Sequence, residues 1–258
     1  MNTQAALVTG GASGIGLGIA HELEKIGITP IVFDRNAPPQ GTPGEFVQVD
    51  LSDANLTAEA LRELVQRTKV TGLVNNVAAV GAGRIEDVTY ADIQQVWELN
   101  IRCAIQCVQA LLPAMKESHS GRIVNIASRA SLGKAYRTVY GASKAGLHSM
   151  TRTWTLELAR YGVTVNTVSP GPIETPLFRA TNTLDNPRTA YLINSIPVGK
   201  MGQPEDIANA VGFFFRPESW FITGQNLYVD GGMSIALAGA DGHPPGFVEA
   251  RTFGDKND

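Results

Sequence analysis

The chain has 258 residues, of which 43% are hydrophobic, and it carries a net charge of −3 at pH 7. Such a chain can bury a full core, and its charge does not favour nucleic acid as a partner. No apolar run approaches the roughly 20 residues that cross a bilayer, and the N-terminus lacks the pattern of a signal peptide. We therefore expect a cytoplasmic protein that binds neither nucleic acid nor membrane.

Apolar runs alternate with helical patterns along most of the chain. We expect strands at 5–9, 30–34, 45–50, within 70–78, at 121–128, within 162–171 and within 226–232, and helices at 14–27, 54–67, 91–117 and 139–161. The strands are apolar throughout, which is typical of a parallel sheet covered on both faces. The alternating order predicts an α/β fold with a doubly wound parallel sheet, forming a single domain at 1–235 before a polar tail at 236–258.

The stretch TGGASGIG at 9–16 lies between the first expected strand and the first helix. A dinucleotide site needs a tight turn, close approach of the backbone to a pyrophosphate, and a helix N-terminus that holds the phosphate. Gly10, Gly14 and Gly16 suit these needs, and no lysine follows them as it would in a P-loop. The stretch indicates a dinucleotide site, with a plain glycine turn as the alternative.

Asp34 ends the second expected strand. In a dinucleotide fold an acid there accepts hydrogen bonds from the adenosine ribose and repels a 2′-phosphate, which favours NAD over NADP. Two alternatives stay open, because Arg35 offers a phosphate ligand and an aspartate also suits a turn. Ser13 is not basic, which removes one usual partner of that phosphate, and we expect Asp50 to bind the adenine amino group.

Tyr140 and Lys144 lie four residues apart in YGASK, so that they share one helix face. A cation about 4 Å from the phenol, at an effective dielectric constant of about 20, contributes roughly 4 kcal/mol to its ionisation. That energy lowers the tyrosine pKa by up to about three units, towards the range where an acid/base group works best. The alternative is an exposed pair, but Gly141, Gly146 and the strand-ending Ser128 favour a site.

In this order, the motifs resemble those of the short-chain dehydrogenase/reductase family. They are TGGASGIG, NNVA, Asn100 after WEL, Ser128, YGASK and SPGPIET, and the resemblance covers about residues 4–234. It implies a Rossmann fold, NAD(P)-dependent interconversion of alcohol and carbonyl, and a homotetramer.

The resemblance also implies roles for individual residues. Tyr140 would be the general acid/base, and Lys144 would lower its pKa and hold the nicotinamide ribose. Ser128 would bind the substrate oxygen, with Ser131 as the alternative, and Asn100 would anchor a water of the proton relay. The implied cofactor contacts are Gly10, Ser13, Gly14, Ile15, Gly16, Asp34, Arg35, Asp50, Leu51, Asn76, Val77, Ala78, Tyr140, Lys144, Pro170, Gly171, Ile173 and Thr175.

The sequence departs from the family pattern at three places. The interval from Ser128 to Tyr140 is one residue shorter than usual, which is why Ser131 is the alternative. Ala78 replaces a glycine of the usual NNAG, and the segment 35–44 is short and holds three prolines that oppose a helix. We therefore expect a more open adenosine pocket. Tyr136 is not a candidate base, because it lies eight residues from Lys144.

The basic residues near the expected substrate region are Arg129, Lys134, Arg137, Arg179 and Arg188. They favour a polar secondary alcohol such as a polyol, a sugar or a hydroxy acid, and solvated loop charge is the alternative. A catalytically silent protein that senses the dinucleotide is the rival function, although it could lack the Tyr–Lys pair. Cys103 and Cys107 have no further ligand nearby, so we expect core residues and no metal.

Overall fold

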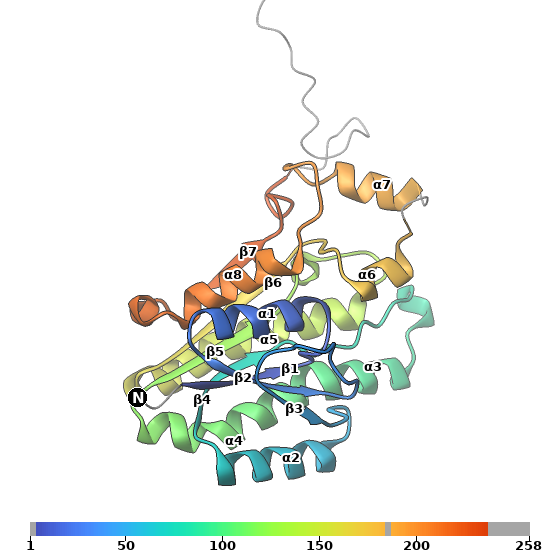
Figure 1. Ribbon diagram of the computed structural model, residues 1–258. Helices are drawn as coiled ribbons and strands as arrows, with labels where there is room; N and C mark the ends of the chain where they lie inside the picture. Colours follow the sequence, from blue (N-terminus) through green and yellow to red (C-terminus); the bar gives the residue numbers. More distant parts are fainter. Residues whose placement is uncertain (1–3, 184–186, 237–258) are drawn as a thin grey trace, which may run out of the picture.

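The computed structural model describes residues 4–183 and 187–236, without the side chains of Thr181, Pro187 and Arg188. Within these ranges, seven parallel strands form one sheet in the order β3-β2-β1-β4-β5-β6-β7 (Figure 1). The strands are β1 Ala5–Thr9, β2 Thr29–Asp34, β3 Glu45–Gln48, β4 Val70–Asn75, β5 Gly121–Ile126, β6 Val163–Pro170 and β7 Asn226–Val229. The chain moves outward from β1 to β3 and returns at β4, so the strand order reverses between β1 and β4. The structure thus confirms the doubly wound Rossmann fold.

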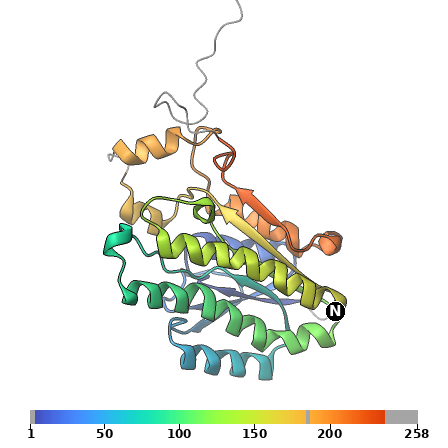
Figure 2. The same cartoon turned by 180° about the vertical axis from the view of Figure 1, so that it is seen from behind.

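Helices cover both faces of the sheet. They are α1 Gly14–Lys25, α2 Ala54–Arg67, α3 Tyr90–Trp97, α4 Cys103–Glu117, α5 Thr138–Leu158, α6 Pro176–Thr181, α7 Pro187–Asn194 and α8 Pro204–Phe215. Helices α1 and α8 bury Ile19 and Ile207 on one face. Helices α2 and α4 bury Leu61 and Leu111 on the other face. Figure 2 shows the helices on that side of the sheet, which also include α5. None of these helices, within the described residues, is long and apolar enough to cross a bilayer.

Short turns complete the chain. They are the 3-10 turns η1 Ile85–Asp87, η3 Arg129–Leu132, η4 Ala159–Tyr161 and η5 Pro217–Phe221, and the π-turn η2 Glu98–Arg102. The sequence predicted one helix over 91–117, but η2 divides it into α3 and α4. A π-turn holds one more residue than an α-turn, and such turns are frequent at functional sites.

Other expectations agree or differ in detail. The segment 35–44 forms no helix, as its prolines predicted, and Cys103 and Cys107 are both buried in the core. Helix α8 was not predicted, although Pro204 at its first turn and the capping box of Gln203 mark its start. Of the expected tail, residues 237–258 lie outside the described part of the chain.

Candidate active site

The predicted cofactor residues gather at one edge of the sheet, because parallel strands end on the same side. Five of them follow β1 (Gly10, Ser13, Gly14, Ile15, Gly16), and two lie at the end of β2 (Asp34, Arg35). The others follow β3 (Asp50, Leu51) and β4 (Asn76, Val77, Ala78), or lie at and after the end of β6 (Pro170, Gly171, Ile173, Thr175). Ser128 follows β5 at the same edge. The edge also contains the reversal in strand order, where open α/β sheets bind their ligands.

The turn after β1 has the shape of a phosphate cradle. Gly10 and Gly14 have φ angles of 67° and 51°, in the left-handed region that favours glycine. A Cβ on Gly16 would lie 2.1 Å from the carbonyl oxygen of Gly10, so only glycine fits there. The side chain of Asn76 fixes the turn, since Nδ2 donates to the carbonyl oxygens of Thr9 and Gly10, each at 2.9 Å.

Helix α1 begins directly beyond this turn with its first N–H groups open. Ser13 makes no side-chain capping bond. The first turn of α1, all of whose residues the structure describes, holds no acidic residue. Free N–H groups and the helix dipole favour an anion at this position. The turn and the helix together fit the pyrophosphate of a dinucleotide.

Two aspartates mark the expected adenosine end of the site. Asp34 accepts hydrogen bonds from the backbone N–H of Ala12 and of Asn36, each at 3.0 Å, which holds its carboxylate beside the glycine turn. Asp50 accepts from the backbone N–H and the hydroxyl of Ser52, at 2.9 and 2.7 Å. These bonds, and the charge of Arg35, lower the pKa of Asp50. Both carboxylates are therefore held at the sheet edge that carries the glycine turn.

The catalytic candidates meet at the start of α5. Ser128 interacts with Tyr140 and lowers the pKa of its phenol, and the Ser128 hydroxyl accepts a hydrogen bond from the backbone N–H of Ala130 at 3.1 Å. Ser131 turns away, since its hydroxyl donates to the carbonyl oxygen of Ser128 at 2.7 Å. Tyr136 precedes the helix, has a φ of 64° and is 56% exposed. The geometry therefore places Ser128, and neither Ser131 nor Tyr136, at the centre with Tyr140.

Lys144 is 2% exposed and lies beneath Tyr140. Its Nζ donates to the carbonyl oxygen of Ile126 at 2.7 Å and lies 5.8 Å from the centre of the Tyr140 ring. Burial lowers the pKa of Lys144 to about 7. The ammonium thus has one described hydrogen-bond acceptor and faces an aromatic ring.

The expected depression of the tyrosine pKa is not found in this structure. Burial raises the pKa of Tyr140, and the opposing effects of Ser128 and Arg137 are smaller. A lowered pKa requires an ammonium about 4 Å from the phenol. Instead the Lys144 amine is directed at the Ile126 carbonyl, and burial weakens its own protonation.

Asn100 joins the π-turn to two other segments. Its Nδ2 donates to the carbonyl oxygen of Ala79 at 3.1 Å and to the hydroxyl of Ser143 at 2.9 Å, while its Oδ1 accepts from the N–H of Ala79 at 2.8 Å. The Ser143 hydroxyl in turn donates to the carbonyl oxygen of Tyr140 at 2.8 Å. Asn100 therefore connects the end of β4 to the catalytic turn of α5. Its partners Ala79 and Ser143 were not predicted from the sequence.

The segment after β6 closes the cleft from the opposite side. The Thr175 hydroxyl accepts from the N–H of Phe178 at 3.1 Å and so caps α6. Its methyl lies 3.2 Å from the place that a Cβ on Gly14 would take. A cavity of about 410 Å³ adjoins this segment at Pro172 and Ile173, but no catalytic candidate lines it. The glycine turn and the segment after β6 are thus in direct contact.

The basic residues near the site separate into two groups. Arg179 forms an ion pair with Glu174, so it is not the free cation that the sequence suggested. Burial and the charges of Arg137 and Arg129 lower the pKa of Lys134. The charge of Arg137 also acts to lower the pKa of Tyr140. Among the described residues, no carboxylate forms an ion pair with any of these three cations. The side chain of Arg188 lies outside the described residues.

The chain is similar to proteins of known activity over most of its length. The family model described as enoyl-(acyl carrier protein) reductase matches residues 10–234. The (2S)-[(R)-hydroxy(phenyl)methyl]succinyl-CoA dehydrogenase subunit BbsD of Thauera aromatica is 37% identical over 91% of this chain and 98% of its own. The 3-oxoacyl-[acyl-carrier-protein] reductase FabG of Thermotoga maritima is 32% identical over 90% and 98%. A variant of actinorhodin polyketide ketoreductase, solved with NADPH, is 31% identical over 90% and 98%, with a TM-score of 0.82.

Proposed function

The chain belongs to the short-chain dehydrogenase/reductase family, and from this premise we propose that it interconverts a secondary alcohol and its ketone with NAD(P). The observation that carries the proposal is the meeting of Tyr140, Ser128 and Lys144 at the sheet edge that also carries the glycine turn. A catalytic acid/base, a hydroxyl for the substrate oxygen and a cofactor cradle are the parts that such a reaction requires.

Each residue has a defined task in this reaction. NAD(P), when bound, supplies or accepts the hydride. The Tyr140 phenol gives a proton to the carbonyl oxygen in reduction and removes it from the hydroxyl in oxidation. Ser128 donates a hydrogen bond to the same oxygen, where negative charge develops. Lys144 has three N–H donors when protonated, so one can bind the nicotinamide ribose while another keeps the Ile126 carbonyl.

The role of Lys144 in lowering the Tyr140 pKa depends on its protonation. With a pKa of about 7, the amine is only partly charged at neutral pH. Hydrogen bonding of the charged form to ribose hydroxyls would favour the ammonium, and the ammonium would in turn favour the phenolate. We therefore place this effect in the complex with cofactor rather than in the free protein.

We propose that NAD is preferred over NADP. The support is the Asp34 carboxylate, which lies beside the glycine turn and would repel a 2′-phosphate. The related ketoreductase was solved with NADPH, so the fold itself does not exclude the cofactor with a 2′-phosphate. Arg35, next to Asp34, is the residue that would favour NADP. The ratio of kcat/KM for the two cofactors tests this choice directly.

For the substrate we propose a secondary alcohol that carries an anionic group, such as a hydroxy acid. The support is the cluster of Arg129, Lys134 and Arg137, which lies between Ser128 and Tyr140 and has no ion-pair partner among the described residues. A carboxylate near the reacting carbon would satisfy these charges. Equal kcat/KM for matched carboxylated and neutral alcohols, in the wild type and in Arg137→Ala, would rule out this class.

The decisive experiment removes one hydroxyl group. Tyr140→Phe should lower kcat by about 10²–10⁴-fold, the usual contribution of a general acid/base, and leave NAD(P)H binding within about threefold. Tyr136→Phe is the matched control, because Tyr136 is exposed and outside α5. Full activity of Tyr140→Phe would refute the assignment. Cofactor binding by the wild type without turnover on a broad panel of alcohols and ketones would favour the dinucleotide sensor.

We also propose a cytoplasmic homotetramer built from a single domain at 1–235 with an appended tail. Leu156 on α5 is 86% exposed, and Phe221 and Trp220 of η5 are 83% and 66% exposed. These apolar side chains lie on two different elements, and a tetramer with dihedral symmetry uses more than one kind of contact. Light scattering of the purified protein measures the number of copies.

A further inference from the structure

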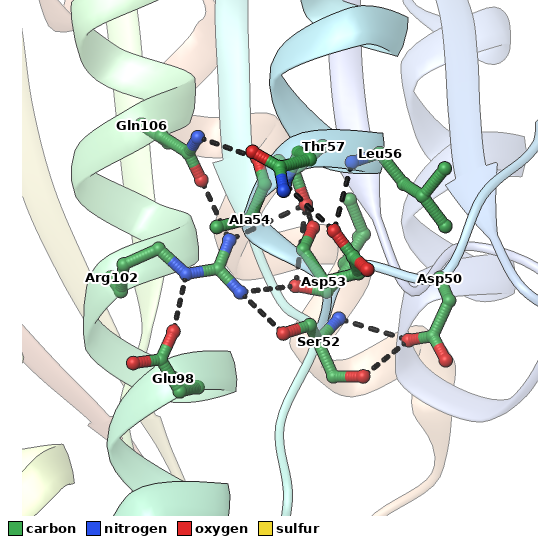
Figure 3. Close-up of polar contacts among 11 residues, drawn as sticks. Asp50, Ser52, Asp53, Ala54, Leu56, Thr57, Glu98, Arg102 and Gln106 are labelled. Carbon is green, nitrogen blue, oxygen red and sulfur yellow. Dashed lines mark hydrogen bonds and ion pairs between the residues drawn. The ribbon is translucent and has the colours of Figure 1, made fainter.

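Arg102 lies at the end of the π-turn and is absent from the set of motif residues. Its guanidinium faces the loop that connects β3 to α2, which Figure 3 shows in close-up. The side chain is only 19% exposed. A largely buried arginine requires partners for its donors, and these partners indicate its role.

All five N–H donors of Arg102 are used. Nε donates to Glu98 Oε2 at 2.7 Å, and Nη1 donates to the Gln106 amide oxygen at 2.6 Å and to the Thr57 hydroxyl at 3.3 Å. Nη2 donates to the carbonyl oxygens of Leu51 and Ser52, at 2.9 and 2.8 Å. A lysine, with three donors and no planar fork, cannot reproduce this set.

Gln106 extends the contact by one more residue. Its Nε2 donates to the carbonyl oxygen of Ala54 at 3.0 Å. Together Arg102 and Gln106 bind three carbonyl oxygens of the four-residue stretch 51–54, which leads into α2. Such a loop would otherwise keep its conformation mainly through its own Asp50–Ser52 bonds and the cap made by Asp53.

The loop carries Asp50, the expected partner of the adenine amino group. Asp50 Oδ1 is occupied by Ser52, whereas Oδ2 accepts no hydrogen bond from the described residues. The direction of that free oxygen depends on the Ser52 backbone, and the carbonyl of the same residue is held by Arg102. The two bonds from Arg102 to the loop carbonyls therefore help to fix the orientation of the Asp50 carboxylate.

We propose that Arg102 is a positioning residue for the adenine ring: it holds the 50–53 loop so that Asp50 accepts the adenine amino group. This inference rests on the proposed function for the presence of a dinucleotide, and on Asp50 as its adenine contact. All five donors of Arg102 bind protein atoms, so none is left for the cofactor or the substrate. Its loss should weaken adenine recognition and leave the chemical step unchanged.

The test compares two cofactors that differ only in the adenine amino group. Binding of the reduced dinucleotide that the wild type prefers, and of its deamino (hypoxanthine) analogue, is measured by calorimetry. We expect the wild type to bind the adenine form about tenfold more tightly, and Arg102→Met and Arg102→Lys to lose most of that ratio. The kcat at saturating cofactor should change by less than about twofold.

Two further variants separate positioning from general stability. Arg67→Met is the matched control, because Arg67 pairs with Glu45 between α2 and β3 and touches none of the three carbonyls. It should keep the full ratio. Gln106→Ala, which removes one carbonyl contact and one partner of Arg102, should give an intermediate ratio and also serves if Arg102→Met does not fold.

The outcomes distinguish this inference from the proposed function. A wild type that binds neither cofactor overturns both. A wild type that binds both forms equally, or an Arg102→Met protein that keeps the full tenfold ratio, overturns the role of Arg102 alone. A fall in affinity by the same factor for both forms means a purely structural role and also overturns it.

Discussion

Replacing Lys144 by methionine should change how the stability of the cofactor-free protein depends on pH. Burial lowers the pKa of Lys144 from 10.5 to about 7 in the folded state. The unfolded chain binds this proton up to about pH 10.5, whereas the folded chain releases it above about pH 7. Stability should therefore rise with pH between 7 and 10.5, and the cost of burying the charge is fully present below pH 7.

The shift converts to a magnitude. At about 1.4 kcal/mol per pKa unit, the buried charge costs ~5 kcal/mol below pH 7. Methionine removes this cost but leaves the Ile126 carbonyl without its donor, which costs ~1–3 kcal/mol. Lys144→Met should thus be more stable than the wild type by about 3 kcal/mol at pH 6, although it should lose its activity.

Urea unfolding at equal protein concentration, from pH 6 to 9.5, measures the effect. The wild-type free energy of unfolding should rise more steeply above pH 7.5 than that of Lys144→Met, by ~1.4 kcal/mol per pH unit, which is the linkage slope of one proton. Lys25→Met, which removes an exposed lysine, should follow the wild-type slope. Parallel curves for the wild type and Lys144→Met would refute the reasoning.

Three more substitutions test other parts of the site. Gly16→Ala should abolish dinucleotide binding, because its Cβ would lie 2.1 Å from a carbonyl oxygen, whereas Gly83→Ala meets nothing within 4 Å and should bind normally in calorimetry. Arg137→Ala should raise the pKa of Tyr140 further, since Arg137 now lowers it, and should move the alkaline rise of the oxidation pH–rate profile to higher pH; an unmoved profile would contradict this. Asp34→Asn should raise kcat/KM for NADP relative to NAD by about tenfold or more, and an unchanged ratio would remove Asp34 from cofactor choice.

The sequence predicted the sheet and the cleft because local patterns determine them. Apolar runs marked the place of every strand, and the glycine turn and YGASK lie where these patterns placed them. The π-turn was missed, because the hydrophobic spacing of 91–117 does not show where one extra residue enters a helix. The role of Arg102 was not predicted either, although Glu98, Arg102 and Gln106 recur at a spacing of four, which places them on one helix face.

The electrostatic predictions were less successful than the positional ones. Spacing places Lys144 on the face of Tyr140, but it cannot tell that the amine points at the Ile126 carbonyl or how strongly burial acts on both groups. Arg179 was expected to be a free cation, yet the start of α6 brings it back to Glu174. Ionisation depends on distances between side chains, which come only from the three-dimensional arrangement.

The single extra residue within Glu98–Arg102 has a consequence for any attempt to redesign this protein. Each residue of an α-helix turns the chain by about 100°, so deleting one position there would rotate α4 relative to α3 by that angle. Asn100 would leave Ala79, and Arg102 would leave the carbonyls of the adjoining loop, in the same step. Both contacts depend on the same rotation of α4, so a shortened chain would lose them together. We therefore expect insertions and deletions within Glu98–Arg102 to be far less tolerated than single side-chain substitutions there.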